Sequence, residues 1–180
     1  MKHEPNVEGQ QLIEAARFVL RPPRPSDAGL ISLYAGDIRV AGKTRSIPHP
    51  LPPGATEMFI GAALSGDRAE DVWIIDGTAN GQPEVMGIFG LERVGEGRSE
   101  VGYWIAPPFW NTGLASEALR AMIDANPHGA TTYFASVFQD NPASARVLTN
   151  AGFQYIGDAE AYSVARAGRV ATWTYCKKLV

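Results

Sequence analysis

The clearest chemical signal in this chain lies in residues 100–116, where an apolar segment runs into a turn of small residues and then into a helical pattern. Pro107 has no backbone N–H and ends the apolar segment, and Leu114 begins a set of apolar residues with helical spacing. A strand that enters a helix through such a turn leaves backbone N–H groups without partners, and the helix dipole adds positive potential there. The segment therefore indicates a binding site for a phosphate-bearing ligand.

A second segment of interest runs from residue 140 to residue 153. Asn141 precedes Pro142, as expected at the start of a helix with Asn as the N-cap and Pro at the first helical position. The Asn141 side chain has a carbonyl that can cap the helix and an amide N–H₂ that can still face a ligand. Ser144, one turn into the helix, has no structural need to be serine. Both polar residues are therefore candidates for contact with a ligand.

Together the two segments resemble the signatures of the GNAT superfamily of N-acyltransferases. The acyl-CoA motif of that family reads (Gln/Arg)-x-x-Gly-x-(Gly/Ala), and residues 110–115 occupy its six positions. Gly113 and Ala115 fit the motif, whereas Trp110 replaces Gln or Arg and looks like the Rim-type branch of ribosomal-protein N-terminal acetyltransferases. Asn111 stands where many members carry glycine, and Asn tolerates a positive φ. The second signature, Asn-x-x-Ser followed by a helix and Gly-Phe, matches residues 141–153.

This resemblance implies that acetyl-CoA is the co-substrate and that no metal is needed. In the family, the strand before the motif diverges from its neighbour, the pantetheine arm lies in the gap, and a backbone N–H polarises the thioester carbonyl. Carried over, those groups are the main chain of Trp104, Ile105 and Ala106. The full set of residues expected to bind the cofactor is Trp104, Ile105, Ala106, Trp110, Asn111, Thr112, Gly113, Leu114, Ala115, Ser116, Asn141 and Ser144.

The reaction implied is attack of an amine on acetyl-CoA, for which a carboxylate can take the amine proton. Glu100 opens the strand beside the expected cleft and is the first candidate; the alternative is a solvated strand-end carboxylate. Glu160 is the second candidate because Rim-type enzymes carry an acidic residue after the sixth strand, and the alternative is a surface charge. Many members use a Tyr of the helix after the fifth strand to protonate the leaving thiolate. Residues 141–152 hold no Tyr, so Ser144 is the nearest hydroxyl.

The elements that must position these residues follow from hydrophobic periodicity and from turn residues. Strands are expected near residues 17–21, 72–75, 85–91, 100–105, 131–138, 153–156 and 170–179, helices near 27–36, 56–64, 114–126 and 142–151, and a Pro- and Gly-rich loop at 41–54. This order is similar to the GNAT topology. It predicts a mixed α/β fold with a central mixed sheet of about seven strands, about four flanking helices and a splayed cofactor cleft, in one domain over residues 1–180 with a loose arm at 1–12.

Composition narrows the other possibilities. The chain has 180 residues, a net charge of −3 and a pI of about 5.6, so it lacks the basic footprint of a protein that binds nucleic acid or an anionic membrane. Its one cysteine, Cys176, cannot form an internal disulfide, and no apolar run approaches the ~20 residues of a membrane helix, so we expect a cytoplasmic protein. The three histidines have no metal-binding spacing; His49 falls in the Pro-rich loop and His128 reads as a turn residue.

We therefore expect an N-acetyltransferase that moves an acetyl group directly to a primary amine in a ternary complex. The amine could belong to a peptide N-terminus or to a small molecule. Residues 41–60 hold only Glu57 as an acid, which makes polycationic acceptors less suitable. The alternative is a non-catalytic acyl-CoA-binding or sensing domain of the same fold. Dimers are frequent in the family, so a homodimer is a further expectation by analogy.

Overall fold

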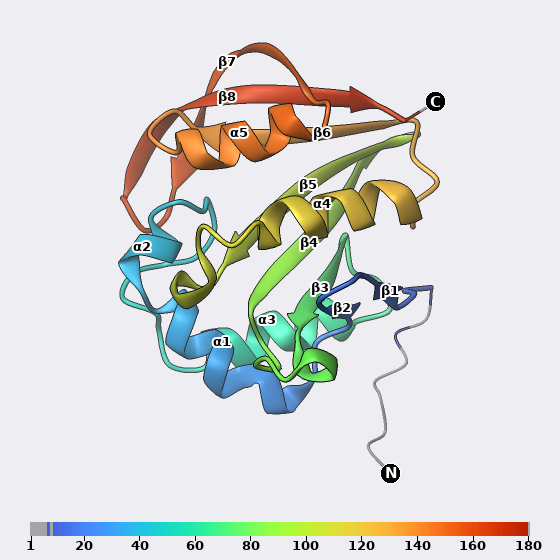
Figure 1. The fold of residues 1–180 in the computed structure, drawn as a ribbon. Helices are drawn as coiled ribbons and strands as arrows, with labels where there is room; N and C mark the ends of the chain where they lie inside the picture. Colours follow the sequence, from blue (N-terminus) through green and yellow to red (C-terminus); the bar gives the residue numbers. More distant parts are fainter. Residues whose placement is uncertain (1–6, 8, 180) are drawn as a thin grey trace.

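The apolar segments form one eight-stranded sheet in a computed structural model that describes residue 7 and residues 9–179 (Figure 1). The strand order is β1-β2-β3-β4-β5-β6-β8-β7, and every neighbouring pair is antiparallel except β5 with β6. The strands are β1 (Ile13–Glu14), β2 (Val19–Arg21), β3 (Glu70–Asp76), β4 (Gly87–Gly95), β5 (Arg98–Ile105), β6 (Thr132–Phe138), β7 (Gln154–Ser163) and β8 (Gly168–Lys178). The helices are α1 (Ala28–Ala35), α2 (Ile38–Ala41), α3 (Ala55–Leu64), α4 (Leu114–Ala125) and α5 (Pro142–Asn150).

The helices cover both faces of this sheet, which explains the continuous apolar runs at residues 72–75 of β3 and 87–91 of β4. Side chains alternate between the two faces along a strand. In β3, Val72 and Ile74 therefore pack in the cluster with α1 and α3, whereas Trp73 and Ile75 pack in the cluster with α4 and α5. The two clusters hold the sheet between two layers of helices, and the sheet sets the positions of the segments that follow β5 and β6.

The parallel pair β5–β6 is joined over only half of its length. Four residue pairs connect 98–101 of β5 with 132–135 of β6, although β5 continues to Ile105 and β6 to Phe138. Beyond that point the two strands diverge, as Figure 1 shows for the green and orange ribbons. Helix α4 follows β5 and helix α5 follows β6, so the N-terminal ends of both helices lie at the same edge of the gap. This confirms the splayed cleft that the family resemblance implies.

The predicted mixed α/β fold is confirmed, with differences in its smaller elements. The short β1 and α2 were not predicted, because segments of two and four residues are too short to show a hydrophobic period. Strands β7 and β8 form a longer hairpin than expected, since most of the β7 side chains are exposed and show no apolar alternation. A register shift between Tyr155 and Gly157 adds to this irregularity.

The expectation of a loose arm at residues 1–12 needs correction at two positions. Val7 and Gln10 are buried, and the Gln10 side chain donates a hydrogen bond of 2.6 Å from Nε2 to the Val72 carbonyl of β3. Gln10 therefore packs against the sheet. Residues 1–6 and 8 lie outside the described residues.

The helices of the fold are short. The longest among the described residues is α4, which has 12 residues. Within that part of the chain, none of them is long and apolar enough to cross a membrane.

Candidate active site

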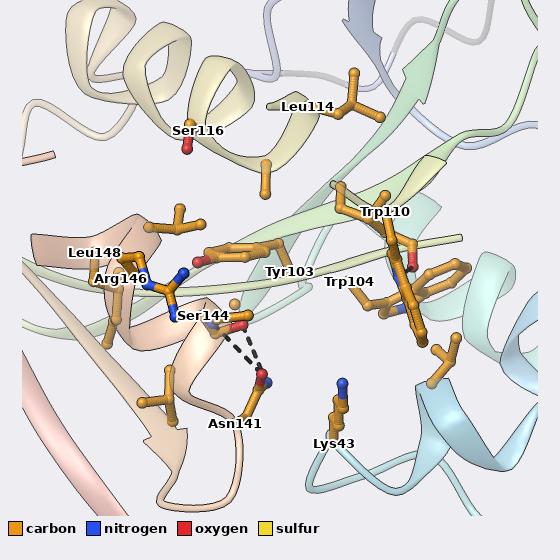
Figure 2. Close-up of a pocket in the computed structure, with 18 of the residues that line it drawn as sticks. Lys43, Tyr103, Trp104, Trp110, Leu114, Ser116, Asn141, Ser144, Arg146 and Leu148 are labelled. Carbon is orange, nitrogen blue, oxygen red and sulfur yellow. Dashed lines mark hydrogen bonds between the residues drawn. The ribbon is translucent and has the colours of Figure 1, made fainter. Parts of the chain in front are cut away.

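The gap between β5 and β6 holds a cavity of about 540 Å³, which we call the first cavity. Figure 2 shows it bounded by the N-terminal end of α4, by the turn that carries Trp110 and by the first turns of α5. Eleven of the twelve residues predicted to bind the cofactor line it: Trp104, Ile105, Trp110, Asn111, Thr112, Gly113, Leu114, Ala115, Ser116, Asn141 and Ser144. Residues far apart in the sequence thus meet around one cavity, as the two motifs predict.

The turn before α4 has the backbone geometry that the motif requires. Asn111 and Gly113 have positive φ angles of 60° and 77°. The turn is fastened to the end of β5, because the Trp110 indole donates from Nε1 to the Ile105 carbonyl over 2.7 Å. No side chain caps α4, so the first N–H groups of the helix have no intrahelical partner and are available to a ligand. This end of α4 therefore fits an anionic group.

Cationic side chains also line the first cavity. Its lining includes Arg39, Lys43 and Arg146 but neither aspartate nor glutamate. The ammonium of Lys43 lies 4.8 Å from the centre of the Trp110 ring, and the guanidinium of Arg39 lies 5.5 Å from it. Trp110 thus replaces the usual Gln or Arg with a surface that holds two cations near the turn. A polyanionic ligand such as the diphosphate of coenzyme A suits this lining.

The backbone donors at the end of β5 differ in part from the prediction. The Ala106 N–H donates to the Met86 carbonyl over 2.9 Å, and Ala106 is buried and does not line the first cavity. Because backbone groups alternate in direction along a strand, the N–H of Trp104 also faces β4. Tyr103 and Ile105 face the opposite edge, where β6 has diverged. The N–H of Ile105 is therefore directed into the gap, whereas Trp104 lines the first cavity without offering its N–H. The prediction that Ala106 supplies a backbone donor is wrong.

At the start of α5 the structure joins Asn141 to Ser144. The Asn141 carbonyl accepts from the Ser144 backbone N–H at 3.5 Å, and its amide nitrogen donates to Ser144 Oγ at 3.1 Å. The amide is thus engaged with Ser144, which was not predicted. The Ser144 hydroxyl hydrogen is left to donate into the first cavity.

Tyr103 is a functional candidate that was not predicted from the sequence. Its hydroxyl oxygen is buried beside Ser144 and has no well-formed hydrogen bond to any described residue. Burial raises the pKa of Tyr103, and the neighbouring Ser144 offsets this only in part. Figure 2 shows the ring extending into the space between α4 and α5, above Ser144. A protonated hydroxyl without a partner is therefore available at this cavity.

A second cavity, of about 390 Å³, lies on the other face of β5 beneath α1 and α3. It includes Glu100, the predicted base, and also Glu70, which the sequence analysis did not consider. Arg45 donates from Nη2 to Glu100 Oε1 over 2.8 Å, so the loop after α2 is tied to β5. The two cavities share residues 101–104 of β5 in their linings, together with Lys43, Thr44 and Ser136.

Glu160, the second candidate base, and His128, expected in a turn, both lie away from the two cavities. Glu160 is in β7, its side chain is 60% exposed, and its carboxylate is 3.6 Å from Arg169, so it has the surface position of the alternative interpretation. His128 is more than a turn residue, because its ring donates to or accepts from Ser99 and Asp71, both at 2.8 Å. Among the described residues, no group of three or more His, Cys, Asp or Glu side chains could hold a metal ion.

Comparison with known proteins agrees with this geometry. A family model described as the acetyltransferase (GNAT) domain matches residues 17–154. The chain is 35% identical over 156 residues to the uncharacterized N-acetyltransferase YoaA of Bacillus subtilis strain 168, a match that covers 84% of this chain and 87% of YoaA.

Solved structures also share the fold. One is the microcin C7 self-immunity acetyltransferase MccE in complex with acetyl-CoA and AMP, with a TM-score of 0.77, 14% identity and coverage of 91% of this chain and 93% of that one. Another is Mycobacterium smegmatis RimJ in complex with CoA-disulfide, with a TM-score of 0.76, 19% identity and coverage of 93% and 87%. At these identities the likeness concerns the fold alone.

Proposed function

The chain belongs to the GNAT family of acetyltransferases, and from that premise we propose that it acetylates a primary amine by direct transfer in a ternary complex. It is an N-acetyltransferase that uses acetyl-CoA as co-substrate. The acceptor and the order of events are the parts that we propose. The amine belongs either to a peptide N-terminus or to a small molecule.

The observation that carries this proposal is the meeting of two cavities at β5. The first cavity offers uncapped N–H groups of α4 and three cationic side chains, which fits the phosphates of acetyl-CoA. The second cavity offers carboxylates, which fit an ammonium group. Because both cavities include residues 101–104 in their linings, a thioester in one and an amine in the other can approach each other at this strand. Direct transfer then requires no covalent enzyme intermediate.

On the amine side, the chain must remove a proton before the nitrogen can attack. We assign that role to Glu100, which lines the second cavity and lies on the strand common to both cavities. A peptide α-amino group has a pKa of roughly 7.7–8.0, so a carboxylate acting directly or through one water is sufficient. The N–H of Ile105 faces the divergent edge of β5 and is placed to stabilise negative charge on the acetyl oxygen.

On the leaving-group side, two hydroxyls lie close together. Acetyl-CoA supplies an acetyl thioester, whose C–S bond breaks as the C–N bond forms. The Ser144 hydroxyl can donate to the departing sulfur, while Asn141 holds the serine in place from its Nδ2. Tyr103 stays protonated because its pKa is raised, so its hydroxyl can donate a further hydrogen bond to the departing sulfur. The overall products are an N-acetylated amine, a free thiol and one proton released from the ammonium.

The test begins with calorimetric titration of the purified protein with acetyl-CoA, using ATP as a phosphate-bearing control. We expect micromolar binding of acetyl-CoA and much weaker binding of ATP. Initial velocities measured against both substrates should then give intersecting double-reciprocal lines. Parallel lines would instead indicate a covalent acetyl-enzyme, and cofactor binding without turnover of any amine would favour the non-catalytic alternative.

Two further proposals concern the setting of the enzyme. Cys176 is a free thiol in the structure, which suits a reducing compartment, and we place the protein in the cytoplasm. A homodimer is proposed by analogy with the family. Size-exclusion chromatography with light scattering tests the second of these proposals.

A further inference from the structure

The second cavity carries information about the acceptor that the family assignment does not supply. Three carboxylates form a row across neighbouring strands, because Glu70 of β3 is directly opposite Glu92 of β4, and Glu92 is directly opposite Glu100 of β5. Residues directly opposite one another share a face of the sheet. Of the three, Glu70 and Glu100 line the second cavity and Glu92 does not. The two lining carboxylates thus stand on either side of β4.

Next to this row, two residues further along β4 and β5 on the same face, the floor of the second cavity consists of glycine. Gly90 of β4 is directly opposite Gly102 of β5, and both line the second cavity. A Cβ added to Gly90 would lie 2.9 Å from the carboxyl carbon of Glu70, so the Glu70 side chain extends from β3 over Gly90. A Cβ added to Gly102 would meet nothing within 4 Å, so that residue opens onto free space. The Glu70 carboxylate therefore leans across the floor towards β5, where the two cavities meet.

The cationic groups of this cavity are already engaged, which leaves one carboxylate for a ligand. Arg45 is paired with Glu100 at 2.8 Å, and the Lys43 ammonium lies over the Trp110 ring at 4.8 Å. Among the described residues no ion pair or hydrogen bond to the Glu70 carboxylate is found. Burial, followed by the neighbouring carboxylates Glu92, Glu100 and Asp71, raises the pKa of Glu70, while Arg45 lowers it. An incoming ammonium would offset this cost of burying a charge.

The rest of the lining is largely apolar. Helices α1 and α3 and the loop between α2 and α3 contribute Ile31, Ala35, Ile47, Leu51 and Phe59. One further polar group points to a ligand, because Thr172 is 1% exposed, lines the cavity and has a hydroxyl oxygen without a hydrogen-bond partner among the described residues. A volume of about 390 Å³ is small for a ligand pocket.

We propose that the second cavity selects a compact primary amine borne on an apolar body, and that Glu70 receives its ammonium group over the Gly90–Gly102 floor. This inference rests on the proposed function. The apolar walls hold the body of the acceptor, and one available carboxylate matches one positive charge. From this position the ammonium passes its proton to Glu100, the proposed base, and the nitrogen attacks the acetyl carbon at β5 as the C–S bond breaks. Polyamines, with several charges and little apolar surface, fit poorly.

The test compares acceptors at saturating acetyl-CoA by following thiol release. The panel contains phenethylamine, ethanolamine, spermidine, and two short peptides that begin with Phe or with Asp. We expect kcat/KM for phenethylamine to exceed the values for ethanolamine and spermidine by about tenfold or more, as burial of an apolar body allows. Preference for the Phe peptide over phenethylamine would identify a peptide N-terminus as the source of the amine, and the reverse would identify a small molecule. Equal use of spermidine and phenethylamine would overturn the inference.

The matched variants are Glu70→Gln and Glu92→Gln, which remove a carboxylate from the same row inside and outside the cavity. We expect Glu70→Gln to raise KM for the amine about 10- to 100-fold, the range of a charge-assisted hydrogen bond, with the Kd for acetyl-CoA unchanged. Glu92→Gln should stay within about twofold of the wild type, because Glu92 lines neither cavity and cannot contact the acceptor there.

Gly102→Ala tests the same proposal in a different way, because it places a methyl group on the floor of the second cavity. The affinity of this variant for acetyl-CoA is measured in parallel. Equal behaviour of the Glu70 and Glu92 variants, with an active wild type, would overturn this inference alone. A wild type that binds no acetyl-CoA, or that acetylates no amine, would overturn the proposed function as well.

Discussion

Arg45 donates a hydrogen bond of 2.8 Å to Glu100, so the carboxylate proposed to deprotonate the acceptor already has a cationic partner. The arginine side chain is 53% exposed, and exposed ion pairs contribute about 1 kcal/mol or less. An incoming ammonium must compete with this guanidinium. We therefore predict that Arg45→Gln lowers KM for the amine by up to about fivefold, which corresponds to about 1 kcal/mol. Arg169→Gln, which removes the partner of Glu160 outside both cavities, is the control and should leave KM unchanged.

Glu100 itself should matter most where the amine is protonated. We predict that Glu100→Gln lowers kcat/KM by about 10²-fold at pH 6.5, the lower end of the range for general base catalysis, and by less at pH 9. Affinity for acetyl-CoA should not change, since Glu100 lines only the second cavity. The pH–rate profile of the variant provides the measurement. A profile parallel to that of the wild type would remove Glu100 from the mechanism.

Tyr103 allows catalysis and stability to be separated. Its buried hydroxyl has no well-formed hydrogen bond, so removing the oxygen should cost the fold nothing. We predict that Tyr103→Phe keeps or raises Tm while kcat falls about tenfold or more, because a hydrogen-bond donor near the leaving thiolate is lost. Ser144→Ala should lower kcat as well, and the double variant should be less than additive if the two hydroxyls act as one unit. A kcat for Tyr103→Phe equal to that of the wild type would assign the hydroxyl to packing.

The cationic lining of the first cavity makes a separate prediction about the cofactor. Lys43→Ala should raise the Kd for acetyl-CoA about three- to tenfold at low salt, because one ammonium is removed from a site for phosphate groups. The difference from the wild type should shrink at 0.5 M salt, where charges are screened over about 4 Å. Lys178→Ala provides a control, since Lys178 is exposed at the end of β8 and lines neither large cavity. Calorimetric titration of the wild type and both variants at two salt concentrations gives all six Kd values.

Local rules account for most of what the sequence predicted. The tolerance of Asn111 for a positive φ, the Asn141 cap and the elements around them each depend on a few adjacent residues, and the structure confirms them. The divergence of β5 from β6 came from the family resemblance and is also present. These features explain why the first cavity was assembled from two short segments of sequence.

The residues that were missed depend on partners far away in the chain. Glu70 is at the start of a strand, and its role can be inferred only from its position opposite Glu92 and over Gly90 of the neighbouring strand β4. Ala106 was misplaced because its N–H is taken by Met86 of a neighbouring strand. The alternation of side chains along β5 could have identified Tyr103, because it lies on the same face of the strand as Val101 and Ile105. No comparable signal marks Glu70.

His128 shows how burial alters a group that the sequence presents as an ordinary turn residue. Its side chain is 2% exposed and lies between Ser99 and Asp71. Arg68 and Arg93 form ion pairs with the same Asp71 carboxylate. The order Ser-His-Asp resembles a hydrolase triad, but Ser99 is buried and lines neither large cavity. We therefore assign this cluster to the stability of the fold.

Burial lowers the pKa of His128, and the bond to Asp71 only partly opposes this. The unfolded chain, with a histidine pKa of about 6.5, then binds a proton that the native state does not. The stability from neutral His128 is present above that value and is lost as pH falls towards the lower native pKa, at up to about 1.4 kcal/mol per pH unit. His128→Asn should be less stable than the wild type at pH 8, and urea unfolding at pH 8, 7, 6 and 5 should show this gap narrowing on acidification. A gap that stays constant over this range would show that His128 titrates alike in both states.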